Sequence, residues 1–103
     1  MSEACQTTEE MIKDAGLSAP RLTPKHIEYT IKKTEFHKLT DVLTTCVLTL
    51  LNGFTVTGES ACASPENYNK AIGEKIAKEN AVEKIWILEG YLLKQKLYDQ
   101  RNK

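Results

Sequence analysis

Residues 44–60 read TTCVLTLLNGFTVTGES, and this stretch decides the fold. Its first eight residues are rich in β-branched and aliphatic side chains, which favour a β-strand. Threonines then alternate with other side chains over residues 54–60. Between the two runs stands Asn52-Gly53, a strong hairpin signal, because both central residues of a type I′ turn need a positive φ. The stretch therefore predicts a β-hairpin over about residues 44–60.

A two-residue turn at Asn52-Gly53 would also fix which residues face each other. It places Leu48 opposite Thr57 and Cys46 opposite Glu59. The first strand is apolar on both of its sides, so we expect both sides to be covered. The second strand carries threonines and a carboxylate on one side, and we expect that side to be only half buried.

The residues before the hairpin predict a short helix. Thr23 is a suitable N-cap and Pro24 suits the first helical position. We expect this helix to run to about Lys33, and residues 34–43 to form either an edge strand or an irregular link. We interpret residues 1–22 as a flexible leader and residues 23–103 as a single domain.

The residues after the hairpin predict a long helix, over about residues 65–98, with Ser64 as its N-cap and Pro65 at its first position. A helix of that span is roughly 50 Å long. A compact domain of this size has a radius of gyration near 13 Å. The helix must therefore either break, near Gly73, Asn80 or Gly90, or protrude and pack against another subunit. The fold class is α+β: short N-terminal helices, a hairpin with a candidate third edge strand, and the long C-terminal helix packed on it.

Helical periodicity gives the long helix two apolar stripes. The first comprises Tyr68, Ala71, Ile72, Ile76, Val82, Trp86, Leu93 and Leu97. The second comprises Ala81, Ile85, Leu88 and Leu92. One hairpin covers one stripe, so we expect Ile85, Leu88 and Leu92 to lie at an interface between copies of a homo-oligomer.

Composition narrows the class of protein. Among the 103 residues, Lys plus Arg and Asp plus Glu each number 14, so the formal net charge is zero. A protein that coats nucleic acid needs a basic excess, which disfavours nucleic acid as a partner. No apolar run approaches the ~20 residues of a membrane-spanning helix, so no membrane contact is expected. Three cysteines at positions 5, 46 and 62 suit reduced thiols in a cytosolic protein.

Catalytic and metal motifs are not recognised in the sequence. A Walker loop, a dinucleotide fingerprint, a nucleophile elbow and metal-ligand spacing are all missing. We therefore expect no catalytic residue, no metal and no cofactor.

A candidate ligand cradle lies between the hairpin and the long helix. Its residues are Thr55, Thr57, Glu59 and Ser60 on the way into the loop, with Lys75 and Glu79 on the helix. Free backbone amides at a helix N-terminus favour a phosphate or carboxylate. A plain capping loop, with Lys75 and Glu79 forming a local i, i+4 ion pair, is the alternative interpretation.

Three stretches carry a family resemblance: APRLTP at 19–24, NGFTVTGESACASPEN at 52–67 and ENAVEKIWILEGYLL at 79–93. With them the chain resembles a small tailed-bacteriophage family called gene product 49 / gene product 66, over about residues 19–97. The resemblance implies a phage or prophage accessory protein that acts in the host bacterial cytoplasm. It implies no activity and no site residues.

The leading hypothesis is therefore a non-enzymatic binding protein in counter-defence, which sequesters a small nucleotide-like signal or occupies a host defence protein. The alternative is a nucleic-acid-associated regulator of phage or host gene expression. It would use two groups of basic residues: Lys25, Lys32, Lys33 and Lys38 near the first helix, and Lys94, Lys96, Arg101 and Lys103 near the C-terminus. A third hypothesis is a small enzyme with Glu59 or Glu79 as its base.

Overall fold

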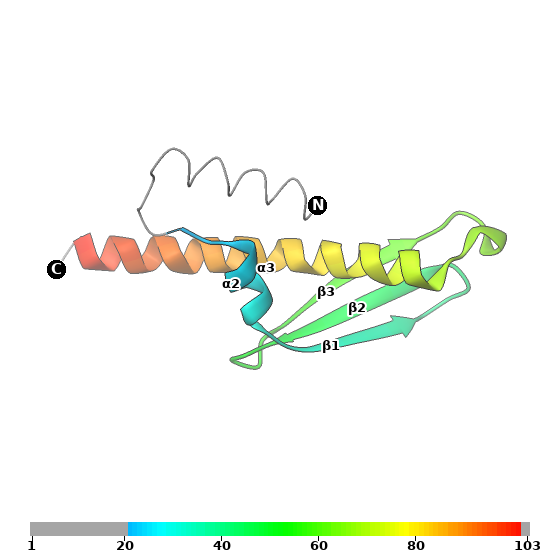
Figure 1. Cartoon of the computed structure of the whole chain (residues 1–103), viewed down its shortest axis with the longest axis horizontal. Coiled ribbons are helices and arrows are strands. Elements are labelled where there is room, and N and C mark those ends of the chain that lie inside the picture. The colour runs from blue at the N-terminus through cyan, green and yellow to red at the C-terminus, as the bar shows by residue number, and fades with distance from the viewer. Residues whose placement is uncertain (1–20, 102–103) are drawn as a thin grey trace.

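The computed structural model describes residues 21–101. The elements in chain order are α2 (Pro24–Tyr29), β1 (Ile31–Lys38), β2 (Leu43–Leu50), β3 (Thr55–Ala61), the 3-10 turn η1 (Pro65–Asn67) and α3 (Lys70–Arg101). The strands form an antiparallel sheet in the order β1-β2-β3. The helix α3 runs along one face of this sheet, and α2 lies beside it (Figure 1). The α+β prediction is confirmed, and most of the predicted leader lies outside the described residues.

The hairpin is present, but its predicted register is wrong by one residue. Leu48 pairs with Val56, and Cys46 pairs with Gly58. The loop is wider than a two-residue turn: the amide of Leu50 donates to the carbonyl of Phe54 at 2.8 Å. Gly53 is the one residue with positive φ in the described chain. Asn52 instead accepts a hydrogen bond from the amide of Phe54 through its side-chain oxygen, at 3.0 Å.

The first helix is shorter than predicted, and a third strand follows it at once. Thr23 does cap it, since its hydroxyl accepts from the amide of His26 at 3.1 Å. The helix ends at Tyr29, and Ile31–Lys38 form β1. The prediction of helix to Lys33 is therefore wrong, because pairing with β2 claims the backbone of β1. The edge-strand alternative for residues 34–43 is confirmed in its first half.

The core lies between α3 and the sheet. Its fully buried members are Ile27, Cys46, Leu48, Ala77, Ala81 and Ile85. The helix approaches β3 closely at Gly58, where an added Cβ would lie 2.3 Å from the carbonyl oxygen of Ala77 and the amide nitrogen of Ala81. Glycine on the strand and alanines on the helix are thus what allow the two backbones to meet.

The stripe of α3 that faces the sheet is the second stripe, through Ala81 and Ile85. Ile85 is fully buried in its own chain, so its predicted place at an oligomer interface is corrected. In the first stripe, Val82 and Trp86 pack against the edge of the core, whereas Ile72 and Ile76 are exposed.

α3 is continuous and longer than the sheet beneath it. It begins five residues later than predicted, because Asn69 and not Ser64 caps it: the side-chain oxygen of Asn69 accepts from the amide of Ile72 at 3.1 Å. Ser64 instead precedes η1 without capping it. The helix runs unbroken through Gly73 and Gly90. Its C-terminal third projects past the sheet (Figure 1), and the molecule measures 55 × 31 × 19 Å.

Candidate functional site

The structure divides the predicted ligand residues between different surfaces. Thr55, Thr57 and Glu59 point to the side of the sheet away from α3, because Val56 and Gly58 between them are buried beneath the helix. Ser60 points to the helix side. Lys75 and Glu79 belong to α3, which covers the other side of the sheet from Thr57. The six residues do not form one cradle.

What the structure does bring together is the open sheet face, the side of the sheet that no described element covers (Figure 1). It consists of Lys33, Glu35 and His37 from β1, Thr45, Val47 and Thr49 from β2, and Thr55, Thr57 and Glu59 from β3. Short neutral side chains occupy its middle strand. Ionisable side chains flank them, and the ammonium of Lys33 lies 3.4 Å from the carboxylate of Glu35.

Thr45 is the most constrained residue of the open sheet face. It pairs with His37 on one side and with Glu59 on the other, so the three form a row across the sheet. Thr45 is only 9% exposed. Among the described residues, its hydroxyl oxygen is buried without a hydrogen-bond partner. A buried, unpaired hydroxyl costs about 1–3 kcal/mol.

A second surface, the helix-extension surface, runs from the edge of β3 along the projecting part of α3, and its member Leu92 also borders the junction with α2. We define it by Phe54 of the hairpin loop and by Lys84, Ile87, Leu88, Tyr91, Leu92, Gln95 and Asp99 of α3. Phe54, Lys84, Ile87 and Leu88, together with residues 55–57 of β3, line a groove of about 410 Å³ along the edge of β3. Ile87 and Tyr91 are 72% and 73% exposed, and Leu88 and Leu92 are 39% and 45% exposed. Leu88 and Leu92 therefore lie at the surface, and their place at an oligomer interface stays a prediction.

The junction of α2 and α3 forms a smaller pocket of about 230 Å³. The ring nitrogen Nε2 of His26 lies 2.9 Å from the carboxylate of Glu89 and ties the two helices together. Leu22 lines the same pocket and packs against the core. Arg21, Lys96 and Leu92 also line this pocket, so both cationic and anionic side chains face it.

The two described cysteines differ in environment. Cys46 is fully buried beneath α3, as predicted, and burial raises the pKa of its thiol. Cys62 is half-buried, and its thiol lies 3.3 Å from the carbonyl oxygen of Ser64. It lines a pocket of about 130 Å³ that also holds Tyr68. This pocket is too small for a nucleotide.

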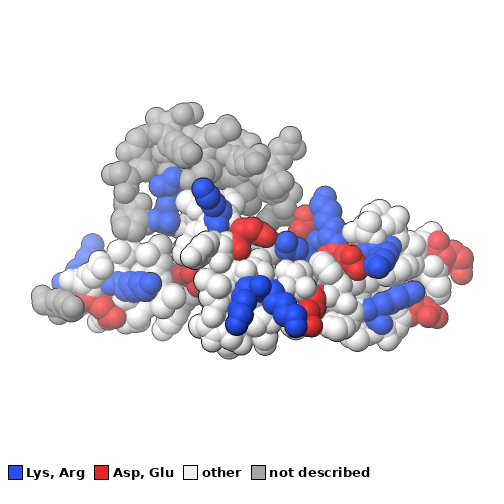
Figure 2. Space-filling view, turned by 60° about the horizontal axis from the view of Figure 1, so that its bottom comes forward, with Lys and Arg blue, Asp and Glu red and all other residues white. Residues whose placement is uncertain are grey.

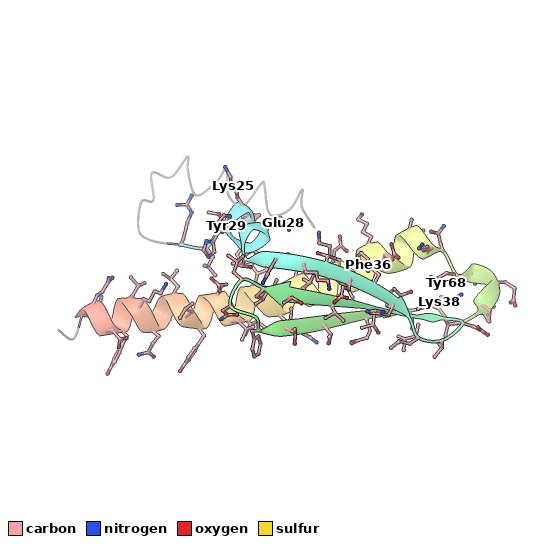
Figure 3. The ribbon with its side chains drawn as sticks, turned by 90° about the horizontal axis from the view of Figure 1, so that it is seen from below. Lys25, Glu28, Tyr29, Phe36, Lys38 and Tyr68 are labelled. Carbon is pink, nitrogen blue, oxygen red and sulfur yellow. The ribbon has the colours of Figure 1, made fainter. Side chains whose placement is uncertain are left out.

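The lysines near the first helix do not form a basic patch. Lys33 pairs with Glu35, and Lys38 lies over the ring of Tyr68 at 4.2 Å, at one end of the sheet (Figure 3). Basic and acidic side chains alternate over the face in Figure 2. This mixture gives no support to the nucleic-acid alternative.

Residues 21–101 contain neither a candidate metal site nor a candidate membrane-spanning helix. No group of three or more His, Cys, Asp and Glu side chains is placed to hold a metal ion. No helix in this range combines the length and the apolar character that crossing a membrane requires.

Comparison with known proteins identifies the class as a bacteriophage protein. Residues 22–97 match the model of the phage protein (N4 Gp49/phage Sf6 gene 66) family. The chain belongs to this family, and the match confirms the resemblance carried by residues 52–67 and 79–93. Neither a curated protein nor a solved structure gives a significant match.

Proposed function

We propose that the protein is a non-enzymatic binding protein that acts in the host bacterial cytoplasm during infection and occupies a host defence protein. It meets this protein through the open sheet face. Membership of a phage family supports a role in infection. The single observation that carries the proposal is a sheet face that no described element covers, with the partly exposed Val47 and Thr49 on its middle strand (Figure 1).

The layout of the open sheet face supports a protein as the partner. Protein interfaces have a poorly charged centre and a polar rim. Here Thr45, Val47 and Thr49 form the centre, and Lys33 and Glu59 lie on the flanking strands. Small-molecule sites are instead concave and enclose most of their ligand. A flat sheet face therefore favours a protein over a small nucleotide-like signal.

The test is a comparison of two threonine variants. The tagged chain is purified from infected cells, the retained protein is identified, and its affinity is measured with purified components. Thr49→Arg places a long cation on the middle strand of the open sheet face, and we expect the Kd to rise about tenfold or more. Thr34→Arg is the matched control, since Thr34 is an exposed threonine on the helix side of β1; its Kd should stay within about twofold of wild type.

Native mass spectrometry of the same preparations then shows whether the chain retains a protein or a small molecule. Equal affinity of both variants would remove the open sheet face from the proposal. A small molecule retained in place of any protein would replace occupation with sequestration.

A further inference from the structure

The apolar stripe of α3 is longer than the part of the helix that the sheet covers. Ala77, Ala81 and Ile85 are buried under the sheet, and the same stripe continues through Leu88 and Leu92, which are 39% and 45% exposed. On the other side of the projecting helix, Leu22 reaches to within 3.9 Å of a Cβ built at Gly90. The described chain thus covers the side of the projection that faces α2, where Leu92 lines one pocket with Leu22, and leaves Leu88 and Tyr91 exposed.

We propose that a second copy of this chain covers the helix-extension surface, with the two α3 helices packed antiparallel about a two-fold axis between Tyr91 and Leu92. A symmetric dimer needs a surface that is complementary to itself. The spacing of Lys84, Leu88, Tyr91, Gln95 and Asp99 by three and four residues puts them on one side of the helix.

The charges on this surface determine the direction of packing. Lys84 stands seven residues before Tyr91, and Asp99 stands seven residues after Leu92. When Tyr91 of one copy lies opposite Leu92 of the other, Lys84 lies opposite the partner's Asp99, and the contact occurs twice. A parallel pair would instead place like charges together. The side-chain amide of Gln95 donates to Asp99 at 2.9 Å and holds this carboxylate beside the surface.

Phe54 enlarges the contact beyond the helices. It is 55% exposed at the hairpin loop and lines one groove with Ile87 and Leu88. An aromatic side chain presents about 150–250 Å² when fully exposed, and a standard interface buries about 800 Å² per partner. The surface areas of Phe54 and Tyr91 are therefore a substantial share of what each copy would bury in the dimer.

The first test is solution mass by light scattering and sedimentation equilibrium on the full chain. We expect twice the monomer mass of 11.6 kDa. Lys84→Glu should raise the dimer Kd about tenfold, because it turns two attractive contacts into repulsive ones. Adding Asp99→Lys to that variant should restore the Kd. Lys75→Glu changes the same charge on a part of α3 outside this surface, and should leave the Kd unchanged.

The second test is a zero-length carbodiimide cross-link. Lys84 and Asp99 of one chain lie 15 residues apart, about 22 Å along the helix, so a Lys84–Asp99 cross-link must join two copies. A wild-type chain that stays monomeric at all concentrations would overturn the proposal. That outcome would hold equally if residues 1–20 occupied the surface in place of a second copy. A dimer that is indifferent to both charge reversals and gives no such cross-link would overturn it equally. Circular dichroism of each variant verifies that it is folded.

Discussion

At the scale of single residues, Gly58 sets the distance between α3 and β3. A Cβ there would overlap the backbone of Ala77 and Ala81 at 2.3 Å, and a helix backbone cannot give way as a side-chain end does. We expect Gly58→Ala to lower the free energy of unfolding by about 1–3 kcal/mol or more, since overpacking forces the backbone to shift. Urea unfolding followed by circular dichroism measures the change.

Gly90→Ala is the matched control for that substitution. Its Cβ would meet only the end of Leu22, at 3.9 Å, which is an ordinary contact. Alanine exceeds glycine in helix propensity by about 0.8–1.0 kcal/mol, so this variant should be the more stable one. A Gly58→Ala variant that is as stable as wild type would contradict the close approach of helix and strand.

Burial of Cys46 predicts a dependence of stability on pH. Burial raises the pKa of its thiol above the ordinary 9.0, with nearby Lys78 acting in the opposite direction. The folded chain therefore holds the thiol proton more tightly than the unfolded chain. The contribution of Cys46 to the free energy of unfolding is therefore complete below pH 9.0, and it is lost as the pH rises above that value.

Comparison with Cys46→Ala isolates this effect from the other groups that titrate in the same range. We expect the free energy of unfolding of wild type to fall more steeply above pH 9.0 than that of the variant. Parallel curves for the two proteins would show that Cys46 titrates alike in the folded and unfolded chains.

At the scale of elements, the start of α3 depends on Asn69. Its side-chain oxygen accepts from the amide of Ile72, and loss of such a cap costs about 0.5–2 kcal/mol. Asn69→Ala should therefore destabilise the fold by that amount in urea unfolding, whereas Ser64→Ala should change stability little, because Ser64 caps no helix. The opposite ranking would mean that the helix begins at residue 65 in solution.

The elements were predictable wherever a local signal acts alone. Thr23-Pro24 starts α2 as expected, and Asn52-Gly53 does separate two paired strands. The end of α2 was not predictable, because residues 31–33 suit a helix locally and become strand only through pairing with β2. The register failed for a related reason: Asn52 caps the loop with its side chain rather than adopting a positive φ.

At the scale of the whole molecule, periodicity predicted two apolar stripes on α3 but not which one the sheet would bury. That choice depends on Gly58, which admits the small side chains of Ala77 and Ala81 and thereby draws Ile85 inside. The ligand residues failed for a reason of topology. Thr57 and Lys75 are close to the same loop in sequence, yet the sheet separates the surfaces to which they belong.

The uneven cover of α3 predicts uneven stability along it. Amides near Ala77, Ala81 and Ile85 should exchange slowest, because these residues are fully buried. Past the sheet, a helix of a few turns with little packing is marginal in water, so amides over residues 94–101 should exchange fast in a dilute monomer. Hydrogen exchange followed by mass spectrometry at two protein concentrations measures both regions.

Hydrogen exchange also detects the proposed dimer, because the protection that the dimer gives depends on protein concentration. Antiparallel packing buries Leu88 and Leu92, so protection over residues 88–99 should rise with protein concentration, while protection near Ala81 should not. Leu92→Lys should abolish the rise and leave the buried half of α3 unchanged, because Leu92 is already 45% exposed and contributes little to the core. Protection over residues 88–99 that is high and independent of concentration would show that the chain covers this surface by itself.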